Sequence, residues 1–344
     1  MVTVGVLTGI GETLDQFFPE LIAHWREAGL QVVSAASNQS QLADHTILPS
    51  LSRRPQLRNL AAPYELRRWI VDTSANVVLT NTAVVSFLAR IRPQPCPVVY
   101  FCHGLHWDTG HRVSEKVWQA MELAALKRTS GVIVINDDDE EWFTRHAPRV
   151  PRLRLPSGVG LDVDSFPRSP TPAGQHVQLL WAGEFSDRKR PLLAIEVLAK
   201  MRAQGVDASL VMCGSGPLMH ETQALIDREN LAGYVQLAGQ QTDIASWITK
   251  SHALLLTSRW EGLPRIGLEA IAVGRPVFAF DVKGTRSLDG VVLAPNADPQ
   301  ALAGMIAERL PGNEELAPVP VSLGSGWVAD EIRAFIEPIA HAVK

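Results

Sequence analysis

The sequence contains few cysteines and has no excess of positive charge. Its 344 residues include three cysteines, Cys96, Cys102 and Cys213, which have neither an even count nor the spacing of metal ligands. We therefore expect reduced thiols and no disulfide framework. The net charge of −4 provides no broad basic surface, so no binding of nucleic acid is predicted.

A long apolar run is also absent. No uninterrupted stretch approaches the roughly 20 residues that a membrane-spanning helix needs, so any membrane contact is predicted to be peripheral. The first residues, MVTVGVLTGIGE, lack a basic region and predict a β-strand rather than a signal peptide. We expect a cytoplasmic protein, with the inner face of the membrane as an alternative location.

Short apolar segments alternate with longer segments of helical period, which is typical of parallel sheets with crossover helices. A single core stops growing near about 250 to 300 residues, so this length predicts two domains. Strands are expected at residues 2–8, 31–35, 77–79, 98–101 and 131–135 of the first half. In the second half they are expected at residues 177–181, 208–213, 235–237, 252–256, 276–280 and 291–293.

A proline-rich segment separates the halves, and we place the hinge near residues 166–175. The first domain is predicted at residues 1–168 and the second at 169–326. A final amphipathic helix, residues 327–344, is predicted to cross back to the first domain.

Two strand ends in the first half carry candidate ligand contacts. Gly9 and Gly11 follow the first strand and would let a phosphate approach a helix N-terminus. The third glycine and the ribose-binding acid of a dinucleotide fingerprint are missing, so NAD is not predicted, and a plain turn is the alternative. The segment FCHGLHWDTG places His103, His106 and Trp107 at another strand end, where open α/β sheets bind ligands. No third ligand cluster accompanies the histidines, so we predict ligand contact without metal, with a structural histidine as the alternative.

Two turns in the second half suit an anion. In GEFSDRKRP, Arg188, Lys189 and Arg190 precede an expected helix start, where cations oppose the helix dipole. A bound anion explains them, and a solvated basic turn is the alternative. Gly214 and Gly216 in CGSGP open a second tight turn between a strand and a helix.

The segment SRWEGLPRIGLEAIAVGRPVFAFD holds two glutamates eight positions apart. Glu261 lies on a loop, whereas Glu269 lies beside the apolar stripe of a helix expected at residues 264–273. A buried carboxylate there needs a partner. An intrahelical pair with Arg265 would explain Glu269 but not Glu261.

In this order the segments resemble the family 4 glycosyltransferases of the GT-B fold. EGLPRIGLE is similar to that family's signature of two glutamates separated by seven residues, followed by AVGRPV. FCHGLHW, VIVINDDDEEWF, PSGVGLDVDSF, GEFSDRKRP and CGSGP are similar to other segments of the family. SRRPQLRNL, TNT and HGLHW most resemble bacterial capsule, exopolysaccharide and lipid-linked oligosaccharide glycosyltransferases.

The resemblance implies an α/β protein with two Rossmann-like, doubly wound domains facing a cleft. It implies a retaining, metal-independent enzyme without a cofactor, whose donor is a nucleoside-diphosphate sugar, with a UDP-sugar favoured. The acceptor would be a hydroxyl of a saccharide or a lipid-linked saccharide. The alternatives are a soluble small-molecule acceptor, a sugar-nucleotide epimerase, or a non-catalytic protein that binds nucleotide sugars.

The resemblance also assigns roles to residues. His103, Lys189 and Glu261 would be catalytic, with Lys189 on the donor diphosphate, Glu261 on the transferred sugar and Glu269 on the ribose. Glu184 stands where many members have arginine, and Arg188 would substitute for that cation. The donor-binding set would be Gly11, Arg188, Lys189, Gly214, Gly216, Glu261, Gly262, Leu263, Pro264 and Glu269. The acceptor-binding set would be Arg53, Arg54, His106 and Trp107. Arg58, Arg67 and Arg68 would join the arginines of that set on a lipid-linked diphosphate, or lie on solvated faces.

Overall fold

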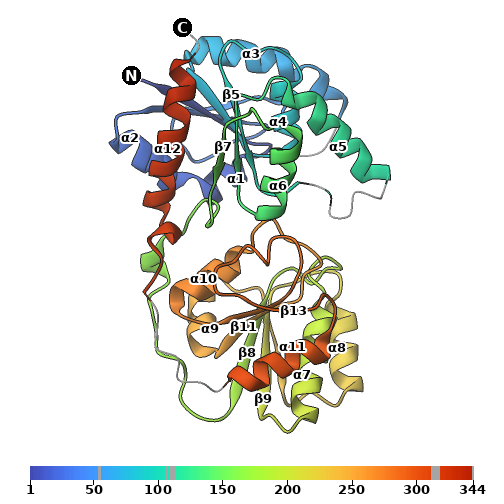
Figure 1. Ribbon diagram of the computed structural model, residues 1–344. Helices are drawn as coiled ribbons and strands as arrows, with labels where there is room; N and C mark the ends of the chain where they lie inside the picture. The colour runs from blue at the N-terminus through green and yellow to red at the C-terminus, as the bar shows by residue number, and fades with distance from the viewer. Residues whose placement is uncertain (53–55, 106, 108–112, 311–317, 343–344) are drawn as a thin grey trace. The chain divides into compact units, whose positions relative to one another are not determined.

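The computed structural model describes residues 1–52, 56–105, 107, 113–310 and 318–342. The chain divides into two compact units: an N-terminal unit, Met1–Gly160 with Gly324–Lys344, and a second unit, Leu161–Leu323 (Figure 1). The boundary lies eight residues before the predicted one, because the Leu161 N–H donates to the Leu323 carbonyl at 2.7 Å and both side chains pack into the core of the second unit. In the described ranges, no helix has the length and apolar character needed to cross a membrane.

The N-terminal unit is built on a seven-stranded, parallel sheet with the order β3-β2-β1-β4-β5-β6-β7. Strands β1, β4, β5 and β6 are buried along their whole length, as expected for a sheet covered on both faces. The strands are β1 Thr3–Leu7, β2 Gln31–Ala36, β3 His45–Ile47, β4 Val77–Thr80, β5 Val98–Cys102, β6 Gly131–Val134 and β7 Arg152–Arg154. The short edge strands β3 and β7 were not predicted.

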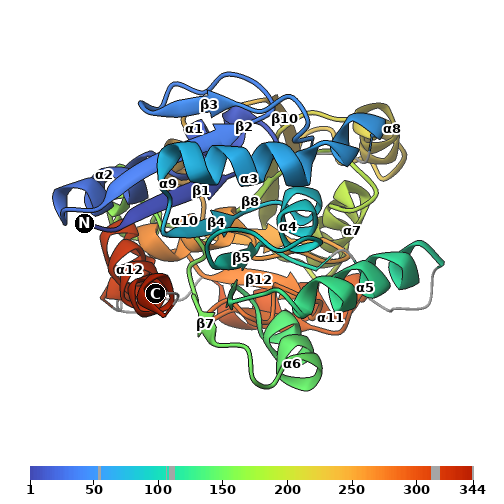
Figure 2. The same cartoon turned by 90° about the horizontal axis from the view of Figure 1, so that it is seen from above.

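Helices α3 and α4 share one apolar core with the sheet of this unit. The C-terminal helix α12 also belongs to this unit, where it packs along α2, and the Trp25 indole donates to the Ala329 carbonyl at 2.8 Å. Figure 2 shows α3 and α12 at different sides of the unit. The helices are α1 Gly11–Phe17, α2 Pro19–Glu27, α3 Ala62–Thr73, α4 Ala83–Arg90, α5 Val113–Leu126, α6 Asp137–His146 and α12 Ser325–His341.

The second unit contains a six-stranded, parallel sheet with the order β10-β9-β8-β11-β12-β13. Its strands are β8 Val177–Ala182, β9 Ala208–Cys213, β10 Val235–Gly239, β11 Ala253–Leu256, β12 Val277–Phe280 and β13 Val292–Ala294. Its helices are α7 Pro191–Ala203, α8 Met219–Arg228, α9 Ile244–Lys250, α10 Arg265–Val273 and α11 Pro299–Arg309. Helix α7 begins at Pro191, directly after the basic turn as predicted, and α10 begins one residue after the predicted start at Pro264. The helix expected after the Gly214–Gly216 turn is α8, which begins at Met219.

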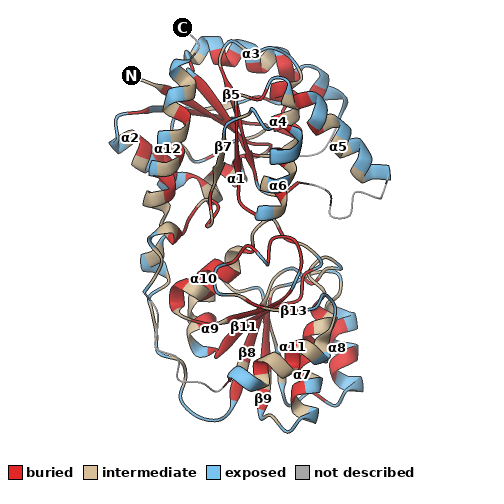
Figure 3. Cartoon of the chain, viewed as in Figure 1, coloured by how far each residue is buried: buried red, intermediate tan, exposed pale blue. Residues whose placement is uncertain are grey.

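Both units are doubly wound. In each sheet the chain builds one side from the first strand outwards and then returns to build the other side, so the strand order reverses beside β1 and beside β8. Open α/β sheets bind ligands at the carboxyl ends of the strands at this reversal. Figure 3 shows the buried strands inside each unit and exposed residues on the outer faces of the helices.

Candidate active site

The reversal point of the second unit brings two loops together. β8 and β11 are adjacent, paired through Ala253 with Leu179 and Leu254 with Leu180. Because the strands are parallel, the loops that follow them leave the same edge of the sheet. The loop after β8 carries Arg188 and Lys189, and the loop after β11 carries Glu261.

Glu261 is buried, with 5% of its surface exposed, and both carboxylate oxygens accept hydrogen bonds from other side chains. Lys189 Nζ lies 2.6 Å from Oε1, and Arg188 Nη1 lies 2.6 Å from Oε2. The Ser258 hydroxyl also donates to Oε1 at 2.5 Å. These four residues, Arg188, Lys189, Ser258 and Glu261, are called the charge cluster below.

The charge cluster keeps Glu261 ionised. Burial alone would raise the pKa of this carboxyl, but the positive charges of Lys189 and Arg188, with hydrogen bonds from Lys189 and Ser258, lower it below its usual value. One carboxylate therefore faces two cations, which leaves the charge cluster with a net positive charge.

Arg190 fastens the two loops to each other. Its backbone is left-handed, with φ of 50°, and its guanidinium donates to the carbonyls of Thr257 at 2.6 Å and Ser258 at 2.5 Å. Burial, together with the charge of Arg259, lowers the pKa of Arg190 to about 10, so it stays charged at neutral pH. Of the three basic residues in this turn, two bind Glu261 and the third binds the backbone of the loop after β11.

The glycines at the predicted second turn allow close backbone contact. A Cβ on Gly214 would lie 1.9 Å from the Gly183 carbonyl oxygen, and one on Gly216 would lie 2.7 Å from the Phe185 backbone. Both residues have positive φ, of 134° and 156°. The turn after β9 is thereby packed onto the turn after β8, which carries Lys189.

Glu269 has a different environment from Glu261. It is 8% exposed on α10, and Arg265 Nε donates to its Oε1 at 3.1 Å, so the intrahelical pair expected as the alternative is present. Burial raises the pKa of Glu269, and the charge of Arg265 only partly opposes this.

The segment between the two glutamates is held from the side by the chain after β12. The Glu261 N–H donates to the Lys283 carbonyl at 2.9 Å. A Cβ on Gly284 would lie 2.4 Å from the Glu261 carbonyl oxygen, so this contact requires glycine. Pro264 is the residue directly before α10, and Gly262 and Leu263 lie between it and Glu261.

In the N-terminal unit, Gly11 begins α1 and its N–H donates to Oδ1 of Asn38 at 2.8 Å. A Cβ at this position would lie 1.9 Å from the Gln39 carbonyl oxygen. Packing against the loop after β2 thus accounts for the glycine, and its contact with a donor stays a prediction.

His103 follows β5 and is exposed, and its ring stacks on Phe101 at 4.2 Å between centroids. Its Nε2 lies 2.7 Å from Oδ1 of Asn81, the residue that follows β4. Because an amide oxygen accepts, Nε2 carries the proton and Nδ1 of a neutral ring is left as an acceptor. Desolvation by the surrounding chain lowers the pKa of the ring, and its exposure to water limits how far.

A buried aspartate that the sequence reasoning left unassigned organises the chain after His103. Asp139 is 1% exposed, and its Oδ2 accepts from the Leu105 N–H at 3.0 Å and from Nδ2 of Asn136 at 2.8 Å. Its place in the NDDD segment was the available signal. Ser258 and Asn81 were also missed as partners of the predicted residues.

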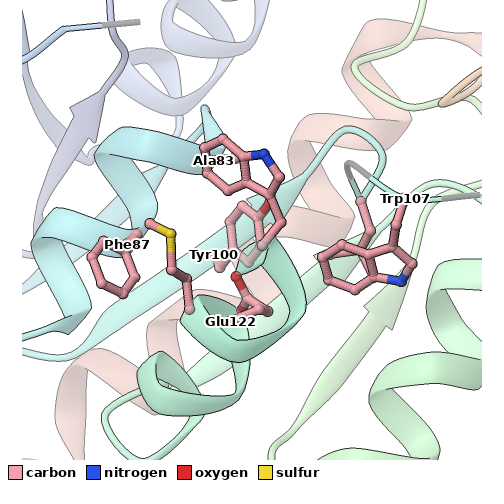
Figure 4. A pocket seen from close by; sticks show the side chains of 8 residues that line it. Ala83, Phe87, Tyr100, Trp107 and Glu122 are labelled. Carbon is pink, nitrogen blue, oxygen red and sulfur yellow. The ribbon is translucent and has the colours of Figure 1, made fainter. Parts of the chain in front are cut away.

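Trp107 lines a small pocket of the N-terminal unit, with Phe87, Tyr100 and Glu122 among the other lining residues (Figure 4). Glu122 forms a buried, two-fold ion pair with Arg90, with distances of 2.6 and 3.0 Å. The lining of the pocket is therefore aromatic and aliphatic except for the Glu122 carboxylate, which Arg90 neutralises.

The remaining predicted residues are not gathered at one place by the described structure. Arg53, Arg54 and His106 lie outside the described residues. Arg67 and Arg68 are exposed on α3, and Arg68 pairs with Asp72 at 3.5 Å, as expected for a solvated face. Across the described ranges, no three His, Cys, Asp or Glu side chains gather closely enough to hold a metal ion.

Two family models match successive parts of the chain. The model for glycosyltransferase family 4 matches residues 17–162, and the model for glycosyl transferases group 1 matches residues 176–310. The chain belongs to the family 4 glycosyltransferases. The second family model includes the charge cluster and Glu269, and the first includes His103 and Asp139.

Two curated bacterial proteins are among those to which this chain is similar. One is the UDP-Gal:alpha-D-GlcNAc-diphosphoundecaprenol alpha-1,3-galactosyltransferase of Escherichia coli, 24% identical over 71% of this chain and 66% of the relative. The other is the alpha-D-kanosaminyltransferase of Streptomyces kanamyceticus, 25% identical over 64% of this chain and 62% of the relative. The matches thus span slightly less than two thirds of either relative.

Solved structures of similar fold match nearly the whole chain. Anabaena HepE in complex with UDP has a TM-score of 0.73 at 15% identity and covers 100% of this chain and 98% of its own. The lipopolysaccharide outer core galactosyltransferase WaaB has a TM-score of 0.71 at 16% identity, covering 99% and 97%. These similarities show the GT-B fold.

Proposed function

We propose that this protein is a retaining, metal-independent glycosyltransferase that moves a hexose from a UDP-sugar to a hydroxyl of a saccharide or lipid-linked saccharide. The observation that carries the proposal is the charge cluster at the reversal point of the second unit. Two cations on one loop face a carboxylate on the next. A diphosphate suits the cations, and sugar hydroxyls suit the carboxylate.

The roles follow from where charge develops. When the sugar leaves the donor, negative charge grows on the diphosphate, and Lys189 and Arg188 stabilise it without a metal. Glu261 accepts hydroxyls of the transferred sugar, and Glu269 accepts the ribose hydroxyls. In the N-terminal unit, Nδ1 of His103 accepts a hydrogen bond from a hydroxyl of the donor sugar or of the acceptor substrate.

The relatives support the choice of substrates. The E. coli relative is named for a UDP-galactose donor and a diphosphoundecaprenol acceptor, and HepE is described in complexes with UDP and UDP-glucose. The donor is therefore assigned to the UDP-sugars first. A peripheral position at a membrane follows for a lipid-linked acceptor and not for a soluble one.

The first experiment titrates the purified protein, in EDTA, with UDP-, GDP- and dTDP-sugars by calorimetry. We expect micromolar to millimolar binding of at least one UDP-sugar and slow hydrolysis that releases the sugar with its anomeric configuration retained, as seen by NMR. No binding of any sugar nucleotide would contradict the proposal. Conversion of the donor sugar without an acceptor would identify an epimerase instead, and binding without hydrolysis or transfer would identify a binding protein.

The acceptor is tested by offering the same donor with a diphosphate-linked saccharide on a lipid and with soluble saccharides. Transfer to the lipid-linked saccharide is the expected result. Transfer to a soluble small molecule alone would favour the alternative acceptor class.

A further inference from the structure

The charge cluster is already satisfied within the protein. Glu261 occupies Lys189 Nζ and one Arg188 nitrogen at 2.6 Å each, and only 15% of the Lys189 side chain is exposed. A diphosphate that binds these cations therefore lies beside the Glu261 carboxylate, and the two anions compete for the same two positive charges.

Two neighbouring arginines of the charge cluster have other partners. Arg190 is held by the carbonyls of Thr257 and Ser258, and Arg259 pairs with Asp187 at 3.0 Å. The segment after β12 faces Glu261 through the backbone carbonyl of Lys283. When the two cations turn to a ligand, Glu261 keeps its hydrogen bond from Ser258 and needs further donors.

A buried carboxylate that loses its cations is costly unless other donors replace them. The sugar of a nucleoside-diphosphate sugar provides hydroxyl donors. A nucleoside diphosphate without the transferred sugar lacks these hydroxyls, and its terminal phosphate carries an additional negative charge. The two ligands should therefore differ in the free energy that Glu261 contributes to their binding.

We propose that Glu261 determines which nucleotide the site prefers, because it yields Lys189 and Arg188 to the diphosphate and takes the hydroxyls of the sugar in exchange. The site then favours the sugar-loaded nucleotide over the spent one and helps to expel the product. This inference rests on the proposed function and adds to it a specificity role for a carboxylate that competes for the phosphate site.

Calorimetric titrations of wild type and Glu261→Gln with inorganic pyrophosphate, UDP and the UDP-sugar selected by the screen test the exchange. Removing the competing charge should tighten the binding of pyrophosphate and UDP about tenfold, equivalent to about 1.4 kcal/mol. Binding of the UDP-sugar should weaken or stay the same, so that the preference for it is lost. If Glu261 had only a structural role, its removal would weaken the binding of all three ligands.

Glu269→Gln is the matched control, since it removes the charge of a second buried glutamate, which pairs with Arg265 on its own helix. This variant should weaken the binding of UDP and of the UDP-sugar by the same factor and leave the binding of pyrophosphate unchanged. The methyl ester of UDP provides a second measurement on the wild-type protein, because it has the charge of a UDP-sugar but no sugar hydroxyls. It should bind at least tenfold more weakly than the UDP-sugar.

The inference is overturned if folded Glu261→Gln binds pyrophosphate no more tightly than wild type, or if wild type binds the methyl ester as tightly as the UDP-sugar. Both results leave the proposed function intact. Failure of wild type to bind any sugar nucleotide is a different result, since it overturns the proposed function and this inference together.

Discussion

Glu261 on its loop and Glu269 on its helix are both buried glutamates, but their surroundings differ. Glu261 receives three donors, two of them cations from another loop, and its pKa is lowered although it is buried. Glu269 receives one cation from its own helix, and burial raises its pKa. The first carboxylate is stabilised by tertiary structure, whereas the second is held at a cost, which is typical of a residue kept for binding.

Removing a cation from Glu261 should give the largest effect. Lys189→Ala is expected to lower donor turnover about 10²- to 10³-fold, because one of two charges that stabilise the leaving diphosphate is lost. Lys200→Ala is the control, since Lys200 is exposed in the last turn of α7, the helix that follows the loop of Lys189, and this variant should retain wild-type turnover. Unchanged kinetics of Lys189→Ala would remove this lysine from the site.

Disturbing the backbone beneath the charge cluster should come next. In Gly214→Ala the new Cβ would lie 1.9 Å from the Gly183 carbonyl oxygen, and residue 214 has a φ of 134°, which alanine rarely adopts. We therefore expect the free energy of unfolding to fall by about 2 to 4 kcal/mol. Gly304→Ala in α11 meets no atom within 4 Å and should stabilise by about 0.5 to 1 kcal/mol. Urea denaturation measures both, and equal effects would show that the close contact at Gly214 is not required.

The two glutamates should respond to pH in opposite ways. The lowered pKa of Glu261 means that its ionised form stabilises the fold above its usual pKa of 4.5, and that this contribution is lost as the pH falls through the lowered value. The raised pKa of Glu269 means that its ionised form costs stability above the raised value, and that this cost disappears as the pH falls towards 4.5.

Melting temperatures between pH 4 and 8 test this opposition. At neutral pH Glu261→Gln should melt below wild type and Glu269→Gln above it. The Glu269 difference should shrink as the pH falls towards 4.5, whereas the Glu261 difference should begin to shrink only below pH 4.5. If both variants shift the melting temperature in the same direction at pH 7, the two environments are not opposite.

The smallest effect is expected at Arg265. Its pair with Glu269 joins residues four apart on one helix, and the guanidinium side chain is 40% exposed. Arg265→Ala should therefore change the free energy of unfolding by only about 0.2 to 0.5 kcal/mol. A loss above about 2 kcal/mol in urea denaturation would mean that Glu269 depends on this cation as strongly as Glu261 depends on its own.

Most strands of the two sheets could be predicted from the sequence because they are apolar and buried. All eleven expected strands are present, whereas β3 and β7, with the sequences HTI and RLR, were missed. Both are three-residue strands at the two edges of the seven-stranded sheet, where pairing with the neighbouring strand rather than an apolar pattern fixes the conformation.

The candidate site could be predicted only in part. Its residue types and strand ends were assigned from the sequence, but the direct contact of Glu261 with Lys189 depends on the adjacency of β8 and β11, which no local pattern encodes. Nor does the sequence Arg-Lys-Arg indicate that Arg190 binds carbonyls while its two neighbours bind a carboxylate. The glycine at position 11 was attributed to a ligand, and packing against Gln39 accounts for it as well.

The bonds of Arg190 also matter for protein engineering. Since its guanidinium joins the loop after β8 to the carbonyls of Thr257 and Ser258, these two segments form one transplantable module rather than two. A chimera that exchanges residues 258–264 alone would combine a loop from another protein with an Arg190 that is not matched to its carbonyls. Exchanging residues 183–190 together with 257–264 would move the anchor and its target as a pair, and is the better starting point for altering the donor sugar.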